Sequence, residues 1–216
     1  MANFGFSRLN VVAPFEPHWR EAKSAVQAEE LLQSAKSAER LADSVADCTL
    51  VIGTGTLAHR KLEQTAVSLP ALAPFVQQEI VRGGRVALVF GPEKRGLTCE
   101  DLSHCHLLVE IPTAPRQPSM NLGQAVAVCL YELSARLSSA ETVAAPVVSL
   151  AASQGELERL AEVVEKTMLA ANYSPAVMRG ANQHDLRLLL RRLALTGQDA
   201  RRILGLFRRI LWRLKH

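Results

Sequence analysis

Two loops rich in glycine and proline, each directly after a short apolar run, constrain the fold of this chain more than any other feature. The first, GPEKRGLT at residues 91–98, follows the apolar run at 85–90. The second, IPTAPRQPSMNL at residues 111–122, follows the run at 107–111 and leads into a helix-like segment at 121–137. Open α/β sheets build ligand crevices from such loops at the carboxyl ends of their strands. The sequence therefore predicts an α/β fold with a site at one edge of its sheet.

Strand-like and helix-like segments alternate along the first two thirds of the chain. Strands are expected at residues 9–12, 49–52, 85–90 and 107–111, with 85–90 as a central strand. Helices are expected over most of 19–46, with a break near 34–37, and then at 70–81 and 121–137. Thr98 and Asp101 have the spacing of a capping box, which predicts a short helix between the strands 85–90 and 107–111. Such alternation predicts a mostly parallel sheet covered on both faces. Helix 121–137 has an apolar stripe made of Leu122, Ala125, Val126, Cys129, Leu130 and Leu133.

A second region begins near residue 139. Residues 139–153 are rich in Ala, Ser and Val and are predicted to be a linker. Ser153 and Glu156 have the spacing of a capping box, which opens a helix through about Ala171. Further helices are expected near 184–195 and 198–214. We therefore expect an α/β domain at 1–138 and a small all-α module at 154–216.

Positive charge is concentrated at the carboxyl end. Residues 179–216 carry 10 Lys and Arg against 2 Asp and Glu, whereas residues 1–178 carry 15 against 19. A concentrated basic segment is typical of an element that binds a polyanion such as RNA. Two plainer alternatives are a solvated helix face and a basic face held against an acidic partner subunit. The candidate phosphate contacts are Arg187, Arg191, Arg192, Arg201, Arg202, Arg208 and Arg209.

Three other kinds of site are not supported by the motifs. Gly91 and Gly96 have the glycine spacing of a P-loop, but Leu97 and Thr98 replace its Lys-Ser/Thr pair. The GTGT sequence at 53–56 does not complete a dinucleotide-binding GxGxxG motif. A metal site built from Cys99, His104, Cys105 and His106 lacks the usual ligand spacing, so no metal is expected.

The cysteines and the apolar runs suggest a compartment. The four cysteines show no paired spacing, which predicts free thiols in a reducing environment. The longest apolar runs are far shorter than the roughly 20 residues of a membrane-spanning helix. The amino terminus does not resemble a secretory signal. We therefore expect a cytoplasmic protein with no membrane partner.

The order of the loops carries a family resemblance. Strand-GTGT, strand-GPEKRGLT and strand-IPTAPRQPSMNL-helix, over residues 1–137, resemble the TrmJ-like branch of the SpoU/TrmH group of SPOUT RNA 2'-O-ribose methyltransferases. The resemblance implies a deep trefoil knot in the carboxyl-terminal half of the sheet and a homodimer formed through the knots. It also implies bound S-adenosylmethionine, with contacts carried over by position to Thr54, Gly55, Thr56, Gly91, Ile111, Pro118, Ser119 and Met120.

The same resemblance implies a reaction and its residues. Methyl transfer to a ribose 2'-hydroxyl of RNA is expected, most of all in the anticodon loop of tRNA. Glu93, Ser119 and Asn121 would form the polar group around that reaction, although Glu93 could simply fix its loop and Asn121 could cap the next helix.

One part of the family pattern is not found in this sequence. Relatives carry a catalytic arginine just before a segment like NFGF, which here stands at residues 3–6 after Met1. Neither Arg8 nor Arg20 matches that arginine. We therefore expect little methyl transfer from the chain as numbered, and the alternative function is that of a non-catalytic, knotted RNA-binding or assembly protein.

Overall fold

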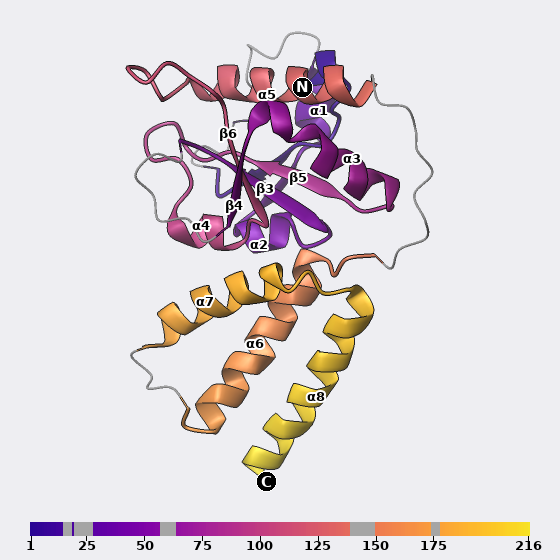
Figure 1. Ribbon diagram of the computed structural model, residues 1–216, viewed down its shortest axis with the longest axis vertical. Helices are drawn as coiled ribbons and strands as arrows, with labels where there is room; N and C mark the ends of the chain where they lie inside the picture. Colours follow the sequence, from indigo (N-terminus) through magenta and orange to yellow (C-terminus); the bar gives the residue numbers. More distant parts are fainter. Residues whose placement is uncertain (15–18, 20–27, 57–63, 139–149, 174–177) are drawn as a thin grey trace.

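A parallel four-stranded sheet organises the first part of the molecule (Figure 1). The computed structural model describes residues 1–14, 19, 28–56, 64–138, 150–173 and 178–216. The sheet has the order β4 (Thr65–Ser68), β6 (Leu107–Glu110), β3 (Leu50–Thr54) and β5 (Val86–Val89). The predicted parallel α/β architecture is therefore confirmed.

Apolar layers cover both faces of this sheet. On one face, η3 (Leu69–Ala71), α3 (Ala73–Val81) and α5 (Leu122–Ser138) pack over a core that includes Ile52 and Val109. On the other face, α2 (Leu41–Ser44) and α4 (Cys99–Ser103) accompany a second core. The members of this second core are Val45, Cys48, Val51, Val89, Leu97, Leu102, Cys105 and Leu108. Consecutive residues of β3 thus enter opposite cores, as the pleat of a strand requires.

Two strand predictions need correction. The segment 85–90 was expected at the centre, but β5 lies at an edge of the four-stranded sheet. A continuous apolar run indicates only that both faces of a strand are covered. Both faces of β5 are covered even though it lies at an edge, so the run does not distinguish an edge strand from a central one. Strand β4 was not predicted, because its sequence, Thr-Ala-Val-Ser, is short and weakly apolar; it is recruited by pairing with β6.

The amino-terminal region contains a small second sheet. It pairs β1 (Asn10–Val12) in parallel with β2 (Lys36–Ala38). The helix predicted over most of 19–46 was expected to break near 34–37, and the break is present, because α1 (Glu29–Ser34) ends there and α2 follows at Leu41. The interruption is longer than predicted and contains strand β2. Pairing with β1 overrides the local helix propensity there. The rest of that prediction, at residues 20–27, lies outside the described residues.

Three helices follow the α/β part and pack on one another (Figure 1). They are α6 (Gln154–Ala170), α7 (Arg179–Arg192) and α8 (Gly197–Lys215). The predicted capping box of Ser153 and Glu156 is present at the start of α6. Their shared core consists of Ala152, Leu157, Leu160, Ala161, Val164, Leu190 and Ala200.

Backbone and charged contacts join these helices to the α/β part. The amide of Gln154 donates to the carbonyl of Cys48 and that of Gly155 to the carbonyl of Ala46, both at 2.8 Å. From α7, Arg187 forms ion pairs with Glu158 on α6, at 2.6 Å, and with Glu100 on α4, at 2.5 Å. Burial opposes the charge of Arg187, but these two carboxylates outweigh it and raise its pKa. The guanidinium therefore links α7, α6 and α4.

His106 connects the starts of β3 and β6. Its Nδ1 accepts a hydrogen bond from the amide of Val51 at 3.0 Å, and its own amide donates to the carbonyl of Val51 at 2.8 Å. Burial lowers the pKa of His106 to about 3. A neutral ring is therefore part of the folded state, since a protonated Nδ1 could not accept this bond.

We expect the free energy of unfolding to fall as the pH is lowered from 7 to 5. An unfolded histidine binds its proton near pH 6.5, whereas folded His106 does so only near pH 3, so in between the unfolded state holds more protons. Stability then drops by up to about 1.4 kcal/mol per pH unit for this residue. Burial also lowers the pKa of His104, which adds to the drop. Urea unfolding at pH 7, 6 and 5 measures the slope.

His106→Asn is the diagnostic variant, because an Asn oxygen can accept from the Val51 amide without titrating. It should flatten the slope even if it lowers stability at every pH. His216→Asn, at the exposed carboxyl terminus, serves as the matched control. An unchanged slope in His106→Asn would show that this ring does not cause the pH dependence.

Candidate functional site

The ends of three neighbouring strands are tied together by short polar contacts. Thr54, the last residue of β3, donates from its hydroxyl to the carbonyl of Val89 on β5 at 3.0 Å. The next amide, that of Gly55, donates to the carbonyl of Val109 on β6 at 3.2 Å. The loops that follow β3, β5 and β6 therefore start side by side at the carboxyl edge of the sheet.

The loop after β6 lies against the loop after β3. The hydroxyl of Thr56 donates to the carbonyl of Pro118 at 3.0 Å, and the hydroxyl of Thr113 approaches the same oxygen at 3.4 Å. A turn from Ala114 to Gln117, closed by a 2.8 Å backbone hydrogen bond, brings Pro118 back to this position. Thr113 was not singled out from the sequence, because only the folded turn shows its partner.

The loop after β5 is joined to the start of α5 by Glu93. Its Oε1 accepts from Asn121 Nδ2 at 2.7 Å and from the amide of Leu122 at 3.2 Å. Asn121 Oδ1 in turn accepts from the amides of Gly123 and Gln124, at 2.9 and 3.3 Å, and so caps α5. Both structural roles considered for these residues therefore occur. The carboxylate also lies where the helix dipole favours negative charge.

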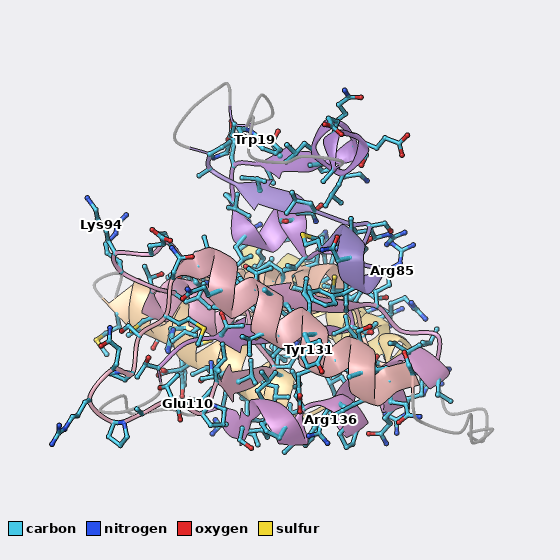
Figure 2. All side chains as sticks on the ribbon, turned by 90° about the horizontal axis from the view of Figure 1, so that it is seen from above. Trp19, Arg85, Lys94, Glu110, Tyr131 and Arg136 are labelled. Atoms are coloured by element: carbon cyan, nitrogen blue, oxygen red, sulfur yellow. The ribbon has the colours of Figure 1, made fainter. Side chains whose placement is uncertain are left out.

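Gly91 allows the loop after β5 to close on itself. A Cβ at this position would lie 2.2 Å from the backbone carbon of Gly96 and 2.3 Å from the nitrogen of Leu97. Gly96 has a positive φ of 63° and donates to the carbonyl of Pro92 at 2.7 Å. The neighbouring Lys94 projects away into solvent (Figure 2). Only glycine fits at residue 91.

The structure brings the predicted site residues together on these three loops. Pro118, Ser119 and Met120 are exposed, with 37% of Met120 accessible. The amides of Ser119 and Met120 and the Ser119 hydroxyl donate no hydrogen bond within the described residues. Ile111 is half-buried against the sheet core, and a Cβ on Gly55 would meet no atom of the described residues within 4 Å. The site thus offers unused backbone donors beside open space.

Two of the seven candidate arginines are not on the surface. The side chain of Arg187 is held in its two ion pairs, and Arg191 is only 8% exposed, donating to the carbonyl of Arg187 at 2.8 Å. Burial lowers the pKa of Arg191 to about 10. Their i, i+4 spacing places both on the face of α7 that meets the α/β part. The other five are exposed: Arg192, Arg201, Arg202, Arg208 and Arg209.

The cysteine and histidine residues near α4 serve other contacts. Cys105 Sγ donates to the carbonyl of Asp101, and burial raises the pKa of this thiol to about 12. In the part of the chain that the structure describes, no three His, Cys, Asp or Glu side chains are grouped to hold a metal ion. Likewise, no helix among the described residues has the length and apolarity to span a membrane.

Comparison with known proteins gives consistent matches. The family model described as the SpoU rRNA methylase family matches residues 1–131. The tRNA (cytidine/uridine-2'-O-)-methyltransferase TrmJ of Klebsiella pneumoniae is 29% identical over 95% of this chain and 86% of its own length. The tRNA (cytidine-2'-O-)-methyltransferase TrmJ of Methanocaldococcus jannaschii is 37% identical over 62% of this chain and 58% of its own.

A solved structure extends the likeness beyond the family match. The crystal structure of TrmJ from Z. mobilis ZM4 superposes with a TM-score of 0.83 at 26% identity. It covers 97% of this chain and 89% of that one. For several curated relatives, however, the chain spans little more than half of the relative's length, between 52% and 58%.

The cap at Asn121 gives a stability prediction. Asn121→Ala removes the acceptor for two helix amides and should lower the free energy of unfolding by about 1 kcal/mol. Asn121→Ser keeps a capping oxygen and should stay within a few tenths of a kcal/mol of the parent. Urea unfolding of the two variants measures the difference. If serine were as destabilising as alanine, the capping role would be wrong.

Proposed function

The chain belongs to the SpoU rRNA methylase family, and from that premise we propose that it transfers a methyl group from S-adenosylmethionine to a ribose 2'-hydroxyl of RNA. The substrate we propose is tRNA, at its anticodon loop, in the cytoplasm. The observation that carries the proposal is the joining of three loops at the carboxyl edge of the sheet, by Thr56 to Pro118 and by Glu93 to Asn121. Ligands of open α/β sheets bind at this edge.

The residues of the three loops fit such a cofactor. When bound, S-adenosylmethionine supplies a methyl group already activated on a sulfonium. The free amides of Ser119 and Met120 would recognise its polar groups, and the proline-rich backbone around them is rigid before binding. Open space at Gly55 and the exposed Met120 leave room beside them. The proposed contacts remain Thr54, Gly55, Thr56, Gly91, Ile111, Pro118, Ser119 and Met120.

Three polar side chains are assigned to the ribose. A ribose hydroxyl becomes a good nucleophile only when its proton is taken or polarised. Glu93 uses Oε1 to hold α5, while its Oε2 has no hydrogen bond within the described residues and can accept that proton. The Ser119 hydroxyl is exposed and donates no hydrogen bond to the described residues, so it can orient the incoming ribose. Asn121 fixes the carboxylate through Nδ2.

The knot and the homodimer are part of the same proposal. A loop held against two earlier loops, as residues 111–121 are, is the arrangement that a threaded chain requires. Tyr131, 60% exposed on the outer surface of α5 (Figure 2), contacts Phe4 edge-on and lies one turn from Val128, which is 37% exposed. A second copy of the chain would cover these apolar side chains. Aromatic residues are enriched at such interfaces.

We also propose that helices α6 to α8 form the RNA-binding module, following a linker at 139–153. The support is their separate apolar core and the five exposed arginines on α7 and α8. The linker itself falls mostly on residues 139–149, outside the described residues. Neutralising RNA phosphates with arginine is a general source of affinity.

The test measures tritiated methyl transfer to unmodified tRNA, with alkaline hydrolysis to show that the modified linkage resists cleavage. Glu93→Gln keeps an acceptor for Asn121 but removes the base, so the kcat that the chain shows, expected to be small because neither Arg8 nor Arg20 matches the family's arginine, should fall by about a further 10²–10⁴-fold while the chain stays folded. Glu132→Gln is the matched control: Glu132 lies on α5 and pairs with Arg136 rather than with the three loops, so its replacement should leave kcat unchanged.

Cofactor binding is measured separately by calorimetry on the folded chain. Binding together with base-dependent transfer supports the proposal. Binding without transfer to any RNA would favour the non-catalytic alternative. Absence of both binding and transfer would contradict the proposed activity.

A further inference from the structure

A groove runs between α6 and α8, the two helices that lie side by side in Figure 1. We call it the α6/α8 groove; it has a volume of about 410 Å³. Arg159 from α6 and Arg201 and Arg208 from α8 line it, with Gly205 between the latter two. Its size is in the range of about 300–1,000 Å³ that is usual for ligand sites.

The groove has an excess of positive charge. Its single lining carboxylate, Glu156, pairs with Arg201 at 2.7 Å, and the side chain of Arg201 stays 67% exposed. Arg159 and Arg208 have no acidic partner within the part of the chain that the structure describes. A guanidinium has five N–H donors, so Arg201 can bind an anion and Glu156 together. The lining therefore favours an anion.

Gly205 keeps part of the groove open. A glycine inside a 19-residue helix lowers stability by about 0.5–1 kcal/mol relative to alanine. Among the described residues, no atom outside the helix's own nearby backbone lies within 4 Å of the place where its Cβ would stand, so packing against them does not require glycine here. A close approach by a ligand would account for it.

Trp212 continues the same side of α8. It follows Arg208 by one turn and is 60% exposed, with its ring stacked on His216 at 5.2 Å. Exposed aromatic rings beside a basic groove act as stacking platforms for the bases of single-stranded nucleic acids. Cations alone would suit any polyanion, but this ring favours a ligand that also presents bases.

We propose that the α6/α8 groove binds a single-stranded segment of the RNA substrate, with Arg159, Arg201 and Arg208 on its phosphates and Trp212 stacked on an unpaired base. This proposal rests on the proposed RNA methylation and adds the path that the single-stranded RNA follows over the protein. Arg201 and Arg208 are seven residues apart, about 10 Å along the helix axis, which suits a chain of phosphates rather than one. Stacking requires a base that is free of a duplex.

The opposite flank of α8 supplies an internal control. Arg202 and Arg209 have the same seven-residue spacing as Arg201 and Arg208, and both are exposed. One residue along a helix is a rotation of about 100°, so this second pair points away from the groove. It lies instead beside the exposed Leu206 and Ile210.

The experiment compares two double variants, Arg201→Gln/Arg208→Gln and Arg202→Gln/Arg209→Gln. Binding of unmodified tRNA and of a single-stranded oligonucleotide is measured by anisotropy between 50 and 200 mM salt. Each phosphate contact to a single strand contributes about 0.7 to the slope of log affinity against log salt. The groove pair should therefore lose about 1.4 in slope and at least tenfold in affinity. The flank pair belongs to the same basic module but lies outside the groove, so it should lose clearly less slope and less affinity than the groove pair.

Two further variants separate binding from folding. Gly205→Leu fills the groove without changing charge and improves helix propensity, so it should fold well yet bind RNA more weakly. Trp212→Leu should lose about tenfold in affinity for the oligonucleotide, whereas Trp212→Phe should retain most of it.

The outcomes distinguish this inference from the function on which it rests. If both arginine pairs lose equally, or if only the flank pair loses, the groove is not the RNA route although methyl transfer still stands. If the parent chain neither binds nor methylates any RNA, the proposed function fails first. A loss that is larger in the groove pair than in the flank pair, together with a loss in Gly205→Leu, supports the groove.

Discussion

Backbone pairing of β3 with β5 on one side and β6 on the other is the constraint on which the rest of the structure depends. Its parallel registers place Gly53 opposite both Val89 and Leu108. A side chain at Gly53 would not fit, since its Cβ would lie 2.8 Å from the sulfur of Cys105 and 3.1 Å from Leu108. Because the strands are parallel, this close packing also sets their carboxyl ends level, and the three loops meet without long connections.

The same polar side chains at that edge hold the loops and carry the proposed chemistry, through different atoms. One carboxylate oxygen of Glu93 accepts hydrogen bonds from Asn121 and from the start of α5. These bonds fix the orientation of the carboxylate and therefore the position of its other oxygen. A group that is held before its substrate arrives loses little freedom on binding. Variants at these residues will therefore mix structural and chemical effects unless the replacement keeps the structural hydrogen bond.

Features set by neighbours in sequence could be predicted, and features set by distant partners could not. The capping boxes of Thr98 with Asp101 and of Ser153 with Glu156 depend only on a four-residue pattern, and both are present. Strands β2 and β4 exist because β1 and β6 pair with them, a relation that no local pattern carries. The site residues were placed on adjacent loops by family resemblance. The concentration of positive charge identified the arginines of α7 as candidates. It did not show that Glu100 and Glu158 would enclose Arg187.

The contacts beneath α4 have a consequence for cooperativity. Gln154 and Gly155 satisfy carbonyls that belong to the α/β part, Arg187 reaches Glu100, and His104 is covered to 4% exposure beside Gln154. Opening this boundary would hydrate a buried imidazole, a buried amide and the mostly buried carboxylate of Glu158 together. The sheet and helices α6 to α8 should therefore unfold in one transition rather than two. A substitution that destabilises one of these helices should then also lower the stability of the loops at the sheet edge.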